Sequence, residues 1–386
     1  MPPQPVRRSG LSHDGADDGT QLLHADLHNH SLLSDGAGDP ERAFALMRAA
    51  GLDVAALTDH ASIPRARLHE VESGDYPDES AYQLALTAPY SLDDDGWKLT
   101  AELADAADVP GEFTAIRGFE WTEPWLGHAN VWFSDDYLDV TTPGRIAGLH
   151  EWLREESPQA LFGYNHPGRE PGTMHEFRLD PAVADRMVAL ELFNRTDDYL
   201  FEGWTLGRPS PLVTCLDAGW RPGLVGVSDE HSRSYGLVGK GRTGLWAPTH
   251  DRAGVRAALL ARRSYATREV GLLLDATLGG LRMGSTLRAR GRVELAVEVR
   301  GGAYDGRTVE LQVLGSTPGE PAPTVHLQAP ATGGTLTRVD LDVPTDARWL
   351  VLRVADPARP NPASGPYGHP GNAYAVAYAS PWWRED

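Results

Sequence analysis

The chain contains 386 residues, of which 35 are Lys or Arg and 54 are Asp or Glu, so its formal net charge is -19. Such an acidic chain is repelled by nucleic-acid backbones and by anionic membrane surfaces, which excludes both as general partners. We therefore expect a small-molecule substrate, and one that is anionic if metal ions sit in the site. The single cysteine, Cys215, excludes an intramolecular disulfide.

Residues 1–20 are rich in Pro, Asp and Gly, which predicts a disordered N-terminal tail. Arg7 and Arg8 are not followed by an apolar region, so we expect no secretory signal. No stretch approaches the ~18 consecutive apolar residues of a membrane span. Together with the lack of disulfides, these features favour a cytoplasmic protein.

Residues 21–270 alternate short apolar runs with helical segments, a pattern typical of a parallel α/β fold. Residues 26–35 are interpreted as the first strand. Helices are expected from Asp39, as N-cap, to Gly51, at 101–107, 145–155 and 211–219, and after Thr249. Further buried strands are expected at 53–60, 113–120, 127–133, 160–166, 187–194 and 223–231.

The segment 61–110 is longer than a connection between a strand and a helix needs, so it is interpreted as an insertion. Within it, residues 93–96 are expected to break the structure. Two placements stay open, one over the site and one as a plain surface excursion.

Residues 271–386 have a different pattern, in which apolar side chains occupy every second position. Val293, Leu295, Val297 and Val299 are one example, and residues 309–313, 339–343, 350–354 and 374–378 repeat it. This alternation predicts an antiparallel β-sandwich domain. No cluster of potential ligands occurs there, so its expected role is packing, covering the barrel or contact within a homo-oligomer.

Potential metal ligands recur at the ends of the predicted strands. A lone pair such as His28 and His30 is explained equally well by structural histidines, but the repeated placement favours a shared site, because carboxyl ends of barrel strands converge on one face. The candidate ligands are His28, His30, Asp35, His60, Glu120, His128, His166, Asp229 and His231. The other histidines considered, expected at the surface, are His24, His69, His150, His175 and His250.

Nine such groups are enough for two or three divalent ions when one carboxylate bridges. Imidazole combined with carboxylate suits zinc, manganese or iron. Glu120 is the best candidate for the bridging ligand because it stands alone at its strand end. Asp26 and Asp59 lie beside ligand positions and are expected to orient them.

The ordered motifs resemble those of the PHP (polymerase and histidinol phosphatase) superfamily, and details after Glu120 resemble its CehA/McbA, or carbaryl-hydrolase, branch. The motifs are Asp26-Leu27-His28-Asn29-His30, Ser34-Asp35-Gly36, Thr58-Asp59-His60, Gly118-Phe119-Glu120, Gly127-His128, Asn165-His166-Pro167 and Ser228-Asp229-Glu230-His231. The resemblance implies a distorted (β/α)7 TIM-like barrel with a trinuclear metal site. Two departures are Glu230, where a smaller residue is often found, and the lack of an export signal.

Carried over to this chain, the resemblance implies three ligand sets. One ion would be held by His28, His30, Glu120 and Asp229, a second by Glu120, His128 and His166, and a third by Asp35, His60 and His231. Within these sets we assign catalytic roles to Glu120, Asp229 and His231.

The expected activity is metal-dependent hydrolysis, with a metal-bridging hydroxide as the nucleophile. The first hypothesis is a phosphoesterase acting on a small-molecule phosphate ester. The alternatives are a carbamate, carboxylic ester or amide hydrolase of the carbaryl-hydrolase type, and a catalytically silent metal-binding module. Four arginines near strand ends are candidates for binding an anionic substrate: Arg169, Arg195, Arg233 and Arg268.

Overall fold

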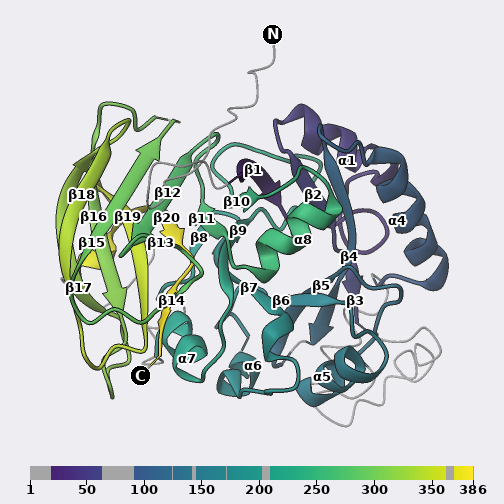
Figure 1. Cartoon of the computed structure of the whole chain (residues 1–386). Coiled ribbons are helices and arrows are strands. Elements are labelled where there is room, and N and C mark those ends of the chain that lie inside the picture. Colours follow the sequence, from purple (N-terminus) through teal and green to yellow (C-terminus); the bar gives the residue numbers. More distant parts are fainter. Residues whose placement is uncertain are drawn as a thin grey trace.

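The computed structural model describes residues 19–62, 91–123, 125–140, 145–170, 172–201, 209–301, 303–361 and 369–385. Most of the predicted tail, the part of the predicted insertion from 63 to 90, and His69 lie outside these residues. Figure 1 shows a mixed α/β part, formed by the N-terminal segments, beside an all-β part formed by the C-terminal segments. Among the helices described, none is long and apolar enough to cross a membrane.

The α/β part is built on one mixed sheet with the strand order β11-β10-β1-β2-β4-β5-β6-β7-β9. The short strand β3 lies beside the end of β4. The strands are β1 (Gln21–Asp26), β2 (Val54–Leu57), β3 (His60–Ala61), β4 (Thr114–Glu123), β5 (Gly127–Trp132), β6 (Leu161–Tyr164), β7 (Met187–Asn194), β8 (Asp197–Asp198), β9 (Gly223–Val227), β10 (Arg242–Ala247) and β11 (Ser264–Thr267).

Helices lie near the predicted positions, except that α6 was not predicted and α4 begins earlier than expected. They are α1 (Pro40–Ala49), α4 (Asp94–Ala107), α5 (Ile146–Glu155), α6 (Thr173–Phe177), α7 (Pro211–Asp217) and α8 (Arg252–Leu260), with short 3-10 turns at Ala184–Arg186 and Pro370–Asn372. α1 illustrates why they form. The Asp39 side chain accepts the N–H of Glu41, and Phe44 and Met47 are buried three residues apart.

α4 corrects the prediction of a break at residues 93–96. Asp93 is the N-cap, and its side chain accepts the N–H of Gly96 at 2.8 Å. Trp97 and Ala104 are buried, and α4 packs against α1 and β4. This half of the predicted insertion is therefore the helix that connects β3 to the parallel strand β4, and α1 and α4 lie side by side far from the all-β part (Figure 1).

The sheet is mixed, whereas the sequence pattern predicts a parallel one, and backbone hydrogen bonds do not close it into the distorted (β/α)7 barrel that the resemblance implies. β4–β5 and β5–β6 are antiparallel, because a short turn joins β4 to β5. At the opposite edges, β9 packs against β10 and β11 without a strand pairing among the described residues. The Thr243 hydroxyl accepts the Gly226 N–H at 3.1 Å and donates to the Gly226 carbonyl at 2.7 Å. A side chain at Gly226 would place its Cβ 2.5 Å from the Arg242 carbonyl oxygen, so this approach requires glycine.

The all-β part contains a small antiparallel sheet, β13-β12-β15-β18, packed against a larger one. Side chains of both sheets, such as Leu274 and Val297 on one and Val313 and Leu352 on the other, form a single hydrophobic cluster, as expected for a β-sandwich. The strands are β12 (Leu273–Leu278), β13 (Leu281–Arg282), β14 (Thr286–Leu287), β15 (Gly291–Arg300), β16 (Thr308–Gly315), β17 (Thr324–Thr332), β18 (Leu336–Val343), β19 (Trp349–Pro360), β20 (Ala373–Ala379) and β21 (Trp382–Arg384).

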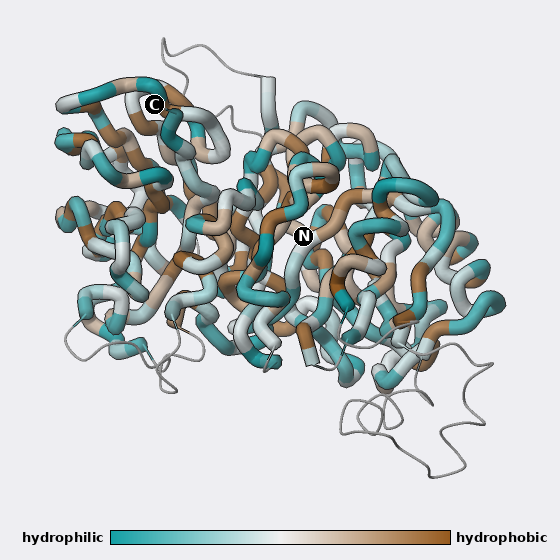
Figure 2. The backbone as a smooth tube through the Cα atoms, turned by 90° about the horizontal axis from the view of Figure 1, so that it is seen from below, coloured by the Kyte–Doolittle hydropathy of each residue, from teal (hydrophilic) through white to brown (hydrophobic). Residues whose placement is uncertain are grey.

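The two parts share one sheet, because β20 pairs with β11 in antiparallel register. β20 is consequently buried on both faces: Val376 packs in the sandwich, and Tyr378 packs in the cluster that fills the α/β part. The alternation of apolar residues at 374–378 therefore does not correspond to burial on one face only. Figure 2 shows hydrophobic segments in the interior of both parts and hydrophilic segments mainly around the periphery.

Candidate metal centre

The predicted first strand ends earlier than the sequence suggests. β1 stops at Asp26, so His28 and His30 lie in the segment that follows it. The prediction that residues 26–35 form the strand itself is therefore wrong. Both imidazoles are nevertheless fully buried, and their ring centroids lie 5.0 Å apart.

The segment after β9 lies beside the segment after β1. The His30 N–H donates to the Glu230 carbonyl at 2.9 Å, and Asn29 forms a parallel bridge with Glu230. This register places Asp229 and His231, which flank Glu230, next to the first two histidines. Asp229 has a φ of 46°, a left-handed conformation that is uncommon outside glycine and often occurs at functional sites.

Glu120 occupies the centre of the candidate site. β4 carries it, and it is 1% exposed. Its carboxylate oxygens lie near five imidazoles: 3.3 Å from His28 Nε2, 3.5 Å from His30 Nε2, 2.6 Å from His60 Nδ1, 3.1 Å from His128 Nδ1 and 3.4 Å from His166 Nε2. This position fits the predicted role of Glu120 as a bridging ligand.

His128 reaches the cluster although it begins its strand. β5 is antiparallel to β4, and Thr122 stands opposite His128 in the pair. The start of β5 therefore lies at the same end of the sheet as the end of β4. The mixed topology thus explains why an N-terminal position on β5 meets C-terminal positions on the parallel strands.

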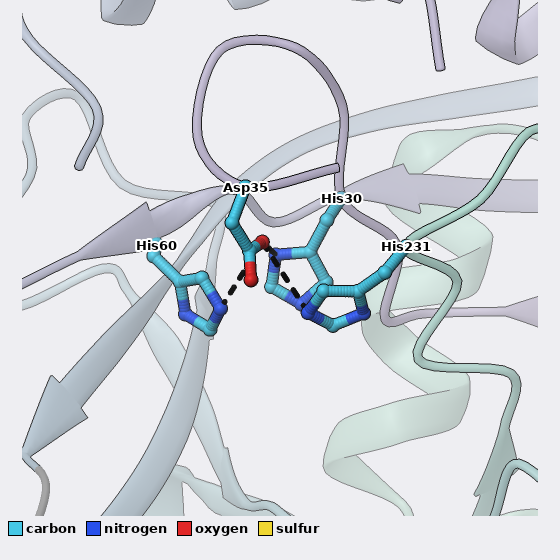
Figure 3. Close-up of side chains that lie close together, drawn as sticks. All are labelled: His30, Asp35, His60 and His231. Carbon is cyan, nitrogen blue, oxygen red and sulfur yellow. Dashed lines mark ion pairs between the residues drawn. The ribbon is translucent and has the colours of Figure 1, made fainter. Parts of the chain in front are cut away.

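A second group surrounds Asp35, as Figure 3 shows. The Asp35 carboxylate lies 3.4 Å from His60 Nε2, 3.3 Å from His231 Nε2 and 3.9 Å from His30 Nδ1. The loop that carries it folds back closely, because a Cβ on Gly36 would lie 2.6 Å from the His30 carbonyl carbon. With 34% of its side chain exposed, Asp35 lies at the rim of the site.

The structure brings all nine candidate ligands into one connected cluster. Four groups have ligand atoms within 4.8 Å of one another: His30, Asp35, His60 and His231; His28, His30 and Glu120; His60, Glu120 and His128; and His128, His166 and Glu170. Asp229 joins them through Oδ1, which lies 3.3 Å from His30 Nε2. Each ligand set implied by the family resemblance is thus brought together in space.

The arrangement of the nitrogen and oxygen atoms in the cluster suits coordination of a metal ion. The Nε2 atoms of His28 and His30 lie 3.0 Å apart, and Glu191 occupies the other nitrogen of His28 at 2.8 Å. With that nitrogen as the donor, His28 directs a lone pair towards His30. The buried His30 Nδ1 also has no hydrogen-bond partner among the described residues, and it lies 3.9 Å from the Asp35 carboxylate.

The electrostatics of the cluster follow from burial and close opposite charges. Burial lowers the pKa of His30 to about 3, and neighbouring His60 adds to this effect. For His60, burial opposes protonation, but Glu120 and Asp35 outweigh it and raise the pKa to about 10. Cations compete with such protons, so imidazole and carboxylate donors of this kind suit zinc, manganese or iron.

Two predicted substrate arginines lie at the cluster. The Arg169 guanidinium lies 2.7 Å from His166 Nε2 and 3.7 Å from Asp229 Oδ2. The Arg195 guanidinium lies 3.0 Å from His231 Nδ1 and 3.3 Å from the same Asp229 oxygen. Their side chains are 39% and 44% exposed, so both groups face the solvent side of the site.

The other two predicted arginines are placed differently. Arg233 is exposed, and its Nε donates to the Ala37 carbonyl at 2.9 Å, next to the Asp35 loop. Arg268 is 3% exposed and lies between the rings of Phe193 and Tyr374. Its guanidinium donates to carbonyls of Thr196 and Ala375, so its described contacts join the two parts of the molecule and do not reach the cluster.

The chain was also compared with known proteins. No family model matches it, and neither does any curated protein. A two-domain protein from Bacteroides vulgatus ATCC 8482, containing a predicted PHP-like metal-dependent phosphoesterase, is similar over 98% of this chain and 100% of its own, with 17% identity and a TM-score of 0.47. A protein from Bifidobacterium adolescentis ATCC 15703, described only as a predicted metal-dependent phosphoesterase, is similar over 61% of this chain and 95% of its own, with 14% identity and a TM-score of 0.34. These similarities are too low to show a shared family or activity.

Glu170 and Glu191 belong to the site but were not among the residues predicted from the sequence. Glu170 lies 3.3 Å from His166 Nδ1 and completes one of the four groups. Glu191 accepts from the His166 N–H at 2.7 Å and lies beside His28. Glu191 is a lone charge inside the apolar strand β7, and that signal could have identified it, whereas Glu170 follows a turn with no distinguishing pattern.

Asp26 and Asp59, which were predicted to orient the ligands, hold the segments that carry them through hydrogen bonds. Asp59 accepts from the Ser31 N–H at 2.7 Å and from the Ser34 hydroxyl at 2.7 Å, which fixes the loop before Asp35. Asp26 accepts from the Ser228 N–H at 3.1 Å, ahead of Asp229. They orient the segments that carry ligands, while Glu191 orients an imidazole directly.

The expectation that the remaining histidines lie at the surface is wrong for His150. It is 4% exposed, its Nε2 lies 3.1 Å from the Tyr164 hydroxyl, and its ring packs against Trp220. It is buried because it belongs to the inward face of α5. His175 is exposed, as expected, and His24 and His250 are partly buried.

Proposed function

We propose that the chain is a metal-dependent hydrolase that cleaves small-molecule phosphate esters. One observation carries the proposal: a buried cluster of imidazoles and carboxylates is flanked on its exposed side by the guanidiniums of Arg169 and Arg195. Guanidinium groups bind the oxygens of phosphate in paired hydrogen bonds. An anionic substrate is therefore expected at this opening in spite of the acidic chain.

The buried residues of the site would bind the metal ions, and the more exposed residues would lie where substrate enters. The deep ligands His28, His30, Glu120 and Asp229 are each at most 2% exposed, so they hold their positions without competition from water. Two or three divalent ions bound there would supply Lewis acidity and lower the pKa of coordinated water. Asp35 and His231 lie nearer the solvent, with side chains 34% and 26% exposed, at the point where substrate would enter.

Arg169 and Arg195 would bind and orient the phosphoryl group. In the structure each guanidinium contacts an imidazole and Asp229, and both are partly exposed, so each can turn to a substrate oxygen without unfolding its segment. Arg195 has a φ of 53°, so a left-handed backbone sets its direction. The Arg169 contact with His166 Nε2 would be exchanged when that nitrogen coordinates a metal.

The second candidate is hydrolysis of an aryl carbamate or carboxylic ester. One observation favours it: Trp125 is 49% exposed in the turn between β4 and β5, and its carbonyl accepts the N–H of Gly172, just beyond Arg169 and Glu170. An exposed indole beside the opening offers an apolar surface for an aromatic group. This surface would serve an aryl phosphate equally well.

Four substrates with one leaving group separate these functions. The metal-loaded protein would be tested on para-nitrophenyl phosphate, bis(para-nitrophenyl) phosphate, para-nitrophenyl acetate and para-nitrophenyl N-methylcarbamate. We expect the highest kcat/KM with a phosphate ester, and about a 100-fold loss with Arg195→Gln, since one charge-assisted contact contributes ~1.5–3 kcal/mol. Arg154→Gln on the exposed face of α5 is the matched control. Faster cleavage of the carbamate or acetate would overturn the proposal in favour of the second candidate.

A further inference from the structure

Arg195 occupies the first position of a two-residue turn at the metal centre. The turn joins β7 to β8, where Asn194 pairs with Asp197 in antiparallel register. Two-residue turns of this kind commonly need a positive φ, and Arg195 has a φ of 53°. The direction in which its guanidinium points therefore depends on how firmly this turn is held.

The α/β part holds the backbone of Arg195 itself. The Arg195 N–H donates to the Val227 carbonyl at 3.1 Å, and its carbonyl accepts the N–H of Gly241 at 2.8 Å. The next strand, β8, lies at the boundary with the all-β part (Figure 1). Among the described residues β8 pairs only with β7, so the all-β part reaches this hairpin through side chains.

Arg268, which follows β11, makes the first of these side-chain contacts. Its Nη1 donates to the Thr196 carbonyl at 2.7 Å, and its Nη2 donates to the Ala375 carbonyl of β20 at 3.1 Å. The guanidinium lies 4.4 Å from the ring centroid of Phe193 and 4.3 Å from that of Tyr374. Arg268 therefore joins the second residue of the turn to β20.

Tyr378, in β20, makes the second contact at the far end of the hairpin. Its hydroxyl lies 3.0 Å from Asp198 Oδ1 and 2.9 Å from Oδ2, and it accepts from Arg353 Nε at 3.0 Å. Asn361 Nδ2 donates to the same carboxylate at 2.9 Å. Asp198, Tyr378 and Arg353 are at most 2% exposed. Hydrogen bonds to charged groups are strong in such a buried network, so the hairpin is fixed to the sandwich.

The network continues into the sandwich beyond Tyr378. Arg353 Nη1 donates to Gln312 Oε1 at 2.8 Å, and its Nη2 donates to the Gly371 carbonyl at 2.8 Å. Strands β16, β19 and β20 therefore all contribute to the contact with Asp198.

Arg169 provides a contrast to Arg195. Its guanidinium contacts His166, Glu170 and Asp229, all of which belong to the α/β part. Of the two arginines at the opening, Arg195 is the one whose segment is tied to the all-β part.

We infer that the all-β part positions the guanidinium of Arg195 for substrate binding, with Arg268 and Tyr378 as the positioning residues. The inference rests on the proposed function for the role of Arg195, whereas the hold on the turn can be measured without turnover. It gives the all-β part a role in substrate binding and leaves metal binding to the α/β part.

Tyr378→Phe tests this inference because it keeps the ring and removes the hydroxyl that reaches Asp198. With para-nitrophenyl phosphate and metal-loaded protein, we expect about a tenfold lower kcat/KM and an unchanged metal content. In an Arg195→Gln background the same substitution should cause less than about a twofold further loss, because the guanidinium that it positions is already absent.

Tyr265→Phe is the matched control. It removes a hydroxyl that is equally buried and donates to the Leu272 carbonyl, away from the hairpin. We expect this variant to keep its kcat/KM within about twofold of the unmodified protein, because one buried hydrogen bond is lost in both variants but only Tyr378 holds the turn.

Hydrogen exchange of the full chain, followed by mass spectrometry, measures the hold on the turn without a substrate. Tyr378→Phe should raise the exchange rate of a peptide covering residues 193–199 about tenfold and leave a peptide from β5 unchanged, whereas Tyr265→Phe should change neither. Arg268→Gln, which releases the Thr196 carbonyl, provides the same tests if Tyr378→Phe does not fold.

The two measurements separate this inference from the proposed function. If the unmodified protein cleaves no phosphate ester, the proposed function fails, and the exchange rates alone decide whether the all-β part holds the turn. The inference is overturned if exchange at residues 193–199 is unchanged in the folded variants. It is also overturned if Tyr378→Phe lowers kcat/KM equally with and without Arg195, or if Tyr265→Phe causes the same loss.

Discussion

The Nε2 atoms of His28 and His30 lie 3.0 Å apart in the interior of the protein, and both imidazoles are fully buried. Two nitrogens at this distance need a proton or a cation between them, because their lone pairs otherwise repel. Glu191 binds the opposite nitrogen of His28 at 2.8 Å, which directs Nε2 into the cluster. The pair therefore holds either a shared proton or a cation at this position.

Replacing this pair should remove the metal. We expect His28→Ala with His30→Ala to lower the metal content per chain, measured by elemental analysis after dialysis, and to abolish hydrolysis, since two of the deepest ligands are lost. His250→Ala is a suitable control, because that imidazole contacts the Asp53 carbonyl outside the cluster. A double variant that keeps the metal content of the unmodified protein would contradict the assignment of these ligands.

Glu191 is expected to act through His28. Glu191→Gln keeps the shape of the side chain but removes the charge that orients the imidazole and increases its basicity, so metal affinity should fall about 10- to 100-fold. Competition with a chromophoric chelator measures this directly. Glu151→Gln, on an exposed position of α5, should leave the affinity unchanged. Equal affinities for the two variants would show that Glu191 has only a packing role.

Buried Glu230 and partly exposed Lys240 form an ion pair beside the ligand segments. Glu230 is 0% exposed, its carboxylate contacts Lys240 Nζ and Ser232, and its backbone carbonyl holds the His30 N–H. Lys240→Gln leaves the carboxylate without its cation, which should reduce the free energy of unfolding by about 1–3 kcal/mol.

Urea denaturation measures that loss. Glu230→Gln combined with Lys240→Gln should recover part of it, because no uncompensated charge then remains buried. A double variant less stable than Lys240→Gln alone would show that the pair is not the source of the effect.

His150 should make stability depend on pH. Burial lowers its pKa to about 4, although Asp180 opposes this shift. In the unfolded chain His150 binds a proton as the pH falls through about 6.5, whereas in the folded protein it does so only near pH 4. The free energy of unfolding is therefore highest above pH 6.5 and decreases by up to ~3 kcal/mol as the pH falls between the two values.

The difference between the unmodified protein and His150→Gln isolates this effect. Urea denaturation of both metal-free proteins at pH 7 and pH 5 should show a smaller loss of stability on acidification for the variant. Metal-free protein is needed because acid also releases metals from imidazoles. Identical pH dependence of the two proteins would assign the acid sensitivity to other groups.

The position of the candidate site could be predicted from the sequence because its ligands follow apolar strands. Glu120, His60 and His166 lie at or just past such runs, and the structure brings them together. The bounds of the first strand could not be predicted, since Leu27 continues the apolar pattern after the backbone has left the sheet at Asp26.

Other features depend on tertiary contacts that leave little trace in the sequence. Arg268 resembles a substrate arginine because it follows a strand, but its place between two aromatic rings is set by β20, a strand distant in the chain. The antiparallel direction of β5 depends on the short turn before it. The cap at Asp93 could have been predicted, since Asp is one of the preferred residues at the N-cap of a helix.

The central claim is that the imidazoles around Glu120 hold metal ions, and anomalous diffraction from crystals of the metal-loaded protein tests it most directly. The account predicts two or three anomalous peaks within coordination distance of the Glu120 and Asp35 carboxylates and the surrounding imidazoles. Anomalous peaks confined to other parts of the molecule would contradict it. The absence of a peak at Glu120, in crystals of protein that carries its full metal content in solution, would contradict it as well.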